Sequence, residues 1–262
     1  MIHLRTSGGR LEEPNILWRN ILLDGPVTVS SAAAGGAGAN SFDGSTADFW
    51  VPTSLPASLS LDLVDPAYAN ALGMAAHTLG SNSATLIIEY LDDATWTELA
   101  TVVPADDTPF MVFFSLTLAD QYRVRITGAG DEPVVGVVMI GHTTVVPGGV
   151  DLPHTPLNLV EETELLSGLS RRGQFLKNRV VRRGGETNIQ FIVQTPDDVE
   201  VYLEAFVEHY NIGDAFFFAT SPSVFPRDMG LCWRPDGARS IQPTYRDPVF
   251  MMMSMQVRVY RG

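Results

Sequence analysis

The chain has 262 residues, a formal net charge of −13, 45% hydrophobic residues and one cysteine. Its length fits one large β domain or two ordinary domains of about 100–150 residues each, and we favour two. The apolar runs are far shorter than the ~18 residues of a membrane span, and the single cysteine excludes an internal disulfide framework. No basic segment followed by an apolar core begins the sequence, so no secretory signal is expected.

Charge is distributed unevenly along the chain, which places a boundary near residue 145. Residues 1–145 contain five arginines, no lysine and 16 acidic residues, whereas residues 146–262 contain 12 basic and 14 acidic residues. We predict the following division: an N-terminal arm at 1–14 that orders only against a neighbour, a first domain at 15–145, a linker at 146–158 and a second domain at 159–262. The acidic balance argues against nucleic acid as the main partner, because a duplex requires a basic face.

The hydrophobic pattern of the first domain predicts β-strands. Leu59, Leu61 and Leu63 alternate with polar residues, and this period of two is typical of a half-buried strand. Further strands are predicted at 84–91, 110–118, 122–127 and 134–140. The last of these is apolar at almost every position, which indicates burial on both faces.

The second domain is predicted to be a β-sandwich or barrel with one packed helix at about 195–212. Thr195 is a suitable N-cap, Pro196 fits the first helical position and Gly213 ends the helix. One apolar face recurs at helical spacing: Val199, Leu203, Phe206, Val207 and Tyr210. The strands predicted around this helix are 174–182, 187–194, 215–220 and 251–260.

Residues 42–50 contain an aspartyl-glycine turn followed by a tryptophan, and residues 20–25 contain a second such turn upstream. Together they resemble the opening of a discoidin-type, galactose-binding-like jelly roll. Residues 121–126 look like the penultimate strand of that fold. The resemblance covers about residues 15–145 and implies a mainly β protein whose N-terminal domain is a jelly-roll sandwich.

The resemblance also implies two kinds of ligand for the first domain. A structural calcium would be held by Asp43 and by Asp48, which stands where the family usually has threonine; the alternative is a turn satisfied by its own hydrogen bonds. Carbohydrate would be bound by Trp50, His77 and Trp96; the alternative is that both tryptophans anchor the core.

Catalysis is not expected from this sequence, and no cofactor other than calcium is implied. The five histidines are scattered without ligand-like spacing, and no nucleophile elbow is present. Cys232 lies beside Trp233 in an apolar setting and is predicted to be a packed small hydrophobe.

A basic segment stands out in the second domain, with six basic and no acidic residues within 13 positions. Its members are Arg171, Arg172, Lys177, Arg179, Arg182 and Arg183. We expect a solvated or subunit-facing strand edge, with a polyanion site as the alternative.

Residues 213–219, the Cys232-Trp233 pair and the closing strand at 251–260 resemble the pattern of tail-tip proteins of long-tailed bacteriophages. The resemblance implies a non-enzymatic distal tail or baseplate protein, made in the host cytoplasm and carried in the virion tail. It implies a ring of three- or six-fold symmetry, with tail tube and tail-tip hub proteins as partners and the basic segment at a subunit or tube interface. The sandwich would project outward, brace neighbouring subunits or touch a host glycan. The alternative function is a carbohydrate-binding module of a glycan-adhesion protein.

Overall fold

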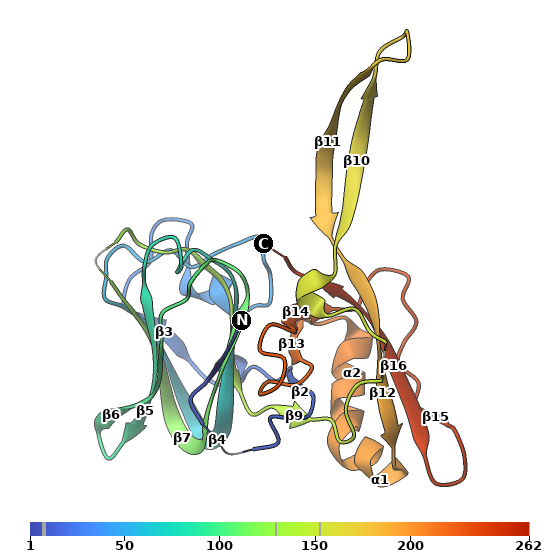
Figure 1. The fold of residues 1–262 in the computed structure, drawn as a ribbon. Coiled ribbons are helices and arrows are strands. Elements are labelled where there is room, and N and C mark those ends of the chain that lie inside the picture. Colours follow the sequence, from blue (N-terminus) through green and yellow to red (C-terminus); the bar gives the residue numbers. More distant parts are fainter. Residues whose placement is uncertain (7–8, 129, 152, 262) are drawn as a thin grey trace.

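The computed structural model describes residues 1–6, 9–128, 130–151 and 153–261; the side chains of residues 163–165, 167, 180–184 and 192–193 lie outside the description. Figure 1 shows three parts: a β-sandwich, a helix-covered sheet beside it, and a long two-stranded hairpin that projects from the second body. The protein is mainly β with one principal helical segment, which confirms the predicted fold class.

The sandwich is formed by a seven-stranded sheet, called sheet A, in the order β3-β4-β7-β5-β6, with β8 beside β4 and β1 beside β7. Its strands are β1 (Ile2–Leu4), β3 (Val27–Val29), β4 (Ala57–His77), β5 (Thr85–Asp92), β6 (Thr95–Val102), β7 (Phe110–Thr127) and β8 (Val135–Gly141). β4 and β7 pair in three blocks, separated by register shifts between Asp62 and Ala67 and between Ala69 and Ala71, and both strands bend there. The sheet thereby folds over itself, and both halves contribute to one core.

The predicted alternation in β4 is confirmed, since Leu59, Leu61 and Leu63 are buried and the intervening side chains are not. β8 is buried along its whole length, as its apolar sequence predicts. The two strands predicted at 110–118 and 122–127 are one strand, β7, because the chain bends there without leaving the hydrogen-bonded ladder.

The second body contains another seven-stranded sheet, called sheet B, in the order β12-β16-β14-β13-β2-β9, with β15 beside β16. Its strands are β2 (Asn15–Leu17), β9 (Thr144–Val145), β12 (Glu186–Gln194), β13 (Phe216–Ala219), β14 (Met229–Trp233), β15 (Thr244–Tyr245) and β16 (Met251–Val259). β2 and β9 lie at the two ends of the predicted first domain, yet both belong to sheet B. The predicted first domain therefore contributes two strands to the second sheet.

Sheet B packs on a helix through one face and on sheet A through the other. The helical face buries Phe216 and Phe218 of β13, and the opposite face buries Phe217 among side chains of β4, β7 and β8. Alternate residues of β13 thus enter different cores, as expected from the two-residue period of a strand. The second body is one sheet with a helix on it, and its other face is covered by the sandwich.

The N-terminal segment differs from the free arm that we expected. Ile2 is buried in the layer between the sheets, β1 runs parallel to β7, and the Ile2 amide donates to the carbonyl of Pro226. Leu11 is buried in the same layer. These apolar side chains find their partners in their own chain, because the junction between the two sheets supplies the apolar surface that a neighbour was expected to provide.

The predicted helix is present with the predicted ends. It comprises α1 (Pro196–Asp198), a π-helical turn η4 (Val199–Leu203) and α2 (Glu204–Ile212). Elsewhere in the chain, three short 3-10 turns are present: η1 (Ile21–Leu23), η2 (Gly38–Ser41) and η3 (Leu157–Leu159). Thr195 and Asp198 form a reciprocal capping box, and Gly213 ends the helix with a φ of 102°. Tyr210 is buried against the sheet and donates its hydroxyl to the carbonyl of Gln256 at 2.6 Å.

The hairpin of β10 (Glu162–Leu169) and β11 (Phe175–Gly184) forms a separate two-stranded sheet. Figure 1 shows it extending away from both bodies. At its tip, Ser170 and Gln174 are hydrogen-bonded and Gly173 has a φ of 79°. Isolated two-stranded hairpins are marginally stable in water, and in the described part of the chain these two strands pair only with each other.

Candidate functional site

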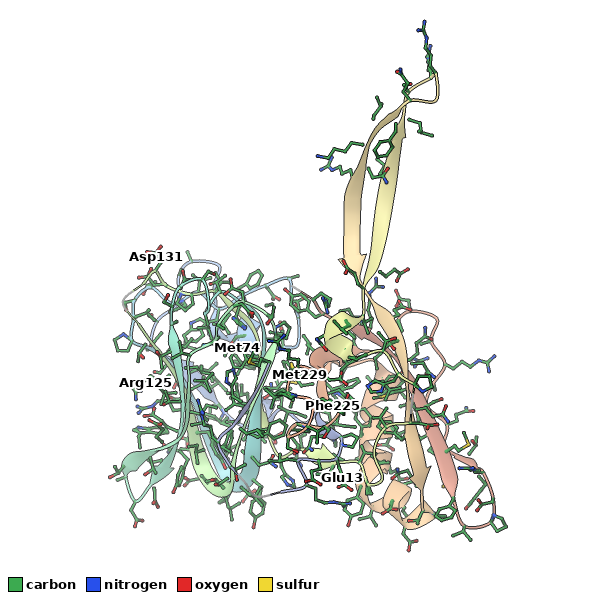
Figure 2. The ribbon with its side chains drawn as sticks, in the orientation of Figure 1. Glu13, Met74, Arg125, Asp131, Phe225 and Met229 are labelled. Atoms are coloured by element: carbon green, nitrogen blue, oxygen red, sulfur yellow. The ribbon has the colours of Figure 1, made fainter. Side chains whose placement is uncertain are left out.

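A pocket of about 610 Å³ lies where the sandwich meets the second body. Five segments form it: residues 18–23, the loop 42–46, Met139 of β8, the helix end and following turn at 209–215, and β14. Its aromatic and ionisable lining is Trp18, Phe42, Asp43, His209, Asp214 and Trp233. Figure 2 shows how densely side chains fill the rest of the junction between the two bodies.

Trp18 and His209 form one wall of the pocket, and local contacts hold both. Trp18 follows β2 directly; its indole N–H donates to Thr144 Oγ1 at 2.9 Å, and its ring centroid lies 5.2 Å from that of His209. His209 Nε2 lies 3.1 Å from the carbonyl oxygen of Ala215, just beyond the helix end. These contacts orient an aromatic surface that the sequence pattern did not indicate.

The loop of residues 42–46 forms the opposite side of the pocket. Ser45 donates its backbone N–H to Asp43 Oδ1 at 2.8 Å, and Gly44 adopts a φ of 85°. This is the turn expected from an aspartyl-glycine pair, because the aspartate bonds its own backbone and glycine accepts positive φ. The turn leaves Asp43 exposed beside the pocket.

The pocket is acidic, since its lining residues include Asp43 and Asp214 but no lysine or arginine. Asp214 is 63% exposed, and its Oδ2 lies 3.9 Å from His209 Nδ1. Partly exposed indole rings of Trp18 and Trp233 stand near these carboxylates. Rings that pack on C–H surfaces and carboxylates that accept from hydroxyls together suit an uncharged polyhydroxylated ligand.

The predicted calcium site is only partly matched by the geometry. Asp43 points one oxygen into its own turn, whereas Asp48 Oδ1 is buried without a hydrogen-bond partner. Calcium takes six to eight oxygen ligands, and within the described ranges no three His, Cys, Asp or Glu side chains gather to hold a metal. Calcium therefore stays a prediction whose one supporting feature is the unpartnered oxygen of Asp48.

The three residues predicted to bind carbohydrate do not share one surface. Trp50 is 1% exposed and donates its indole N–H to the carbonyl of Ser31. His77 is also buried, which lowers its pKa, and its Nε2 lies 3.1 Å from the Thr108 carbonyl oxygen. Trp96 is partly exposed, but the guanidinium of Arg123 lies 4.1 Å above its ring. Trp50 and His77 thus occupy core positions, and their stacking on a sugar stays without support.

The basic segment lies on the projecting hairpin. Arg171, Arg172, Lys177 and Arg179 are exposed, while the side chains of Arg182 and Arg183 lie outside the described part. Large apolar residues of the same hairpin are also exposed, by 63% to 68%: Leu166, Leu169, Phe175 and Leu176. A mixed basic and apolar surface of this kind is typical of a contact with another molecule.

Cys232 is fully buried in β14, and burial raises the pKa of its thiol far above the usual value. The reactive thiolate is therefore suppressed, as expected for a packed core residue.

Sequence reasoning missed Trp18, His209, Asp214 and Trp233 as members of one site. They are separated by up to 215 positions, and none stands in a recognised motif. The one sequence feature that pointed to this region was the turn at Asp43, and we predicted that Asp43 binds calcium rather than that it lines a pocket.

No protein-family model and no curated protein matches the chain. Similar solved structures include SpGH29, at a TM-score of 0.40 and 19% identity over 48% of this chain and 28% of that one. They also include chitosan-binding module 1 of a chitosanase/glucanase from Paenibacillus sp. IK-5, at a TM-score of 0.41 and 22% identity over 47% and 98%. A third is the family 32 carbohydrate-binding module of C. perfringens NanJ, solved with galactose, at a TM-score of 0.41 and 12% identity over 48% and 98%.

These similarities extend over about half of this chain, and the chain spans little more than a quarter of SpGH29. Identities and TM-scores at this level carry no argument about activity. The helices within the described ranges are all too short or too polar to cross a bilayer.

Proposed function

We propose that this protein binds an uncharged glycan in the pocket between its two bodies, without catalysis. The observation that carries the proposal is the lining of that 610 Å³ pocket, which combines Trp18 and Trp233 with two carboxylates and contains no lysine or arginine. Neutral sugars present C–H faces to indole rings and hydroxyl donors to carboxylates. Anionic sugars would face Asp43 and Asp214 without a lysine or arginine to compensate.

Titration calorimetry against a panel of neutral and anionic oligosaccharides tests this proposal. At least one neutral glycan should bind, Trp233→Ala should abolish its binding, and Asp214→Asn should weaken it. Trp96→Ala is the matched control, because that tryptophan lies outside the pocket lining and should leave binding unchanged. Binding that survives Trp233→Ala but is lost in Trp96→Ala would contradict the assigned site.

A second candidate function is assembly, and the exposed hairpin favours it. We propose that β10 and β11 hold subunits together in a homo-oligomer, because four large apolar side chains stand in solvent on an element whose two strands, within the described residues, pair only with each other. The finer assignment, a ring-forming bacteriophage distal tail or baseplate protein of the virion, rests on the sequence resemblance.

Light-scattering mass, combined with negative-stain class averages of the same peak, tests assembly. A closed three- or six-fold ring would support the tail-tip assignment. A variant in which residues 165–181 are replaced by a short turn should remain folded and become monomeric. A full-length chain that stays at 28.5 kDa at every concentration would contradict self-assembly.

A further inference from the structure

A second exposed apolar surface lies on the sandwich, where β4 and β7 bend. Val64 is 90% exposed, Tyr68 53%, Leu116 56% and Leu118 51%. Tyr68 and Leu118 are direct cross-strand partners, and Leu116 precedes Leu118 by two residues, at the register shift opposite Ala69 and Ala71. We call these four residues the bend patch. Apolar residues gathered in this way on a well-packed domain mark a contact surface.

The bend patch is surrounded by acidic residues. Asp62, Asp65 and Asp120 are exposed at the same bend, and residues 62–70 and 115–121 contain no lysine or arginine. Among the described side chains, none of these three aspartates takes part in an ion pair, although Asp62 accepts a hydrogen bond from Gln121. The patch is therefore apolar at its centre and negative at its edge.

The hairpin has the complementary composition. Leu169 and Phe175 are cross-strand partners beside the tip, and Leu166 is paired with Arg179, so apolar and basic side chains alternate along it. Arg171, Arg172 and Lys177 add positive charge around the tip. Two hairpins would repel each other because both are basic. A hairpin and the bend patch both present apolar side chains and carry opposite charges, so they can bind each other.

The positions of the two surfaces require two molecules. In Figure 1 the hairpin projects from the upper end of the second body, and the lower turns of β4 and β7 lie at the opposite end of the sandwich. A strand of eight residues extends about 26 Å, which carries the tip well beyond its own body. The hairpin thus points away from the bend patch of its own chain and toward the space a neighbour would occupy.

We propose that the hairpin of one copy docks on the bend patch of a second copy. The contact is head-to-tail, so repetition of it closes a ring or extends a filament. Apolar side chains from both copies meet at the centre, and arginines of the hairpin pair with Asp62, Asp65 and Asp120 around them. The inference rests on the assembly role proposed above and names the surface that receives the hairpin.

Zero-length cross-linking is well suited to this contact because Lys177 is the only lysine of the chain. A carbodiimide treatment of mixed ¹⁴N- and ¹⁵N-labelled full-length protein should join Lys177 of one copy to Asp62, Asp65 or Asp120 of another. Lys177→Arg should remove the cross-link and keep the oligomer, since the charge is retained. Inter-copy cross-links confined to another acidic surface, such as Glu200, Glu204 and Glu208 of the helix, would overturn the docking site.

Charge exchange gives an independent test by sedimentation velocity. Asp65→Lys with Asp120→Lys should weaken self-association at least tenfold, and adding Arg171→Glu with Arg172→Glu should restore it. Leu116→Ser with Leu118→Ser should also weaken association, whereas the equally exposed pair Val224→Ser with Phe225→Ser should not. An oligomer unaffected by the bend-patch variants refutes the docking site and leaves the assembly role standing. A wild-type chain that is monomeric throughout refutes both.

Discussion

The substitution Gly73→Ala should destabilise the protein, because Gly73 is where β4 passes directly over a buried ring of sheet B. A methyl group built at Gly73 would lie 2.4 Å from Phe217 Cδ2 and 2.6 Å from its Cγ and Cε2. Carbon atoms in contact are normally about 3.5–4.0 Å apart, so the ring would have to move by about 1 Å. Phe217 is fully buried between the two sheets and has little room to do so.

The expected magnitude follows from two opposing effects. Overpacking a core costs about 1–3 kcal/mol, whereas replacing glycine by alanine gains about 0.4–1 kcal/mol by restricting the unfolded chain. The clash is the larger effect, so the free energy of unfolding should fall by about 1–2 kcal/mol. For a chain of this size that corresponds to a decrease in Tm of roughly 2–8 °C.

Urea denaturation of four proteins would measure this effect: wild type, Gly73→Ala, Phe217→Leu and the double variant. Because leucine lacks Cε2 and the rigid ring plane, and its δ carbons can rotate away from the methyl group, Gly73→Ala should cost less in the Phe217→Leu background. A stabilising Gly73→Ala, or an equal cost in both backgrounds, would refute the close packing of sheet A on sheet B at this point.

Three further predictions concern single side chains. Glu89→Ala should cost about 1–3 kcal/mol in urea denaturation, because the buried carboxylate accepts hydrogen bonds from Arg123 and Arg125 at 2.7 and 3.0 Å and both cations would lose that partner. Burial alone would raise the pKa of Glu89, but hydrogen bonds from these arginines outweigh it and hold the pKa below its usual value of 4.5. Its stabilising effect is therefore present at neutral pH and is lost as the pH falls below 4.5 and through the lowered pKa, so Glu89→Gln should lose less stability than wild type on this acidification. Cys232 should not react with a thiol reagent until urea unfolds the protein, and reaction of the folded chain at the rate of a free thiol would contradict its burial.

Local patterns in the sequence were sufficient to predict most of the individual elements. Thr195, Pro196 and Gly213 define the helix ends by interactions within a few residues, and the structure confirms them. The alternation of Leu59 and Leu61 likewise predicts the buried face of β4, because side chains of a strand point to opposite faces in turn. The missed π-helical turn and the continuity of β7 depend on how these elements pack.

The candidate site was less predictable because its parts are distant in sequence. Trp18 and Trp233 become neighbours of one pocket through the placement of β2 and β14 in the same sheet, which no local pattern encodes. Trp50 and Trp96 looked equally suitable in the sequence. The structure buries the first and covers the second with Arg123.

The sequence by itself determined the β-rich class, the helix with its ends, the turn at Asp43 and the unusual basic segment, because each depends on neighbouring residues. Only the tertiary structure decided that residues 1–6 and 9–14 pack on their own chain, that β2 and β9 belong to the second sheet, and that the basic segment lies on a projecting hairpin. These features depend on contacts between residues up to hundreds of positions apart. Apolar periodicity shows which side chains will be buried. The arrangement of the sheets decides which residues those side chains pack against.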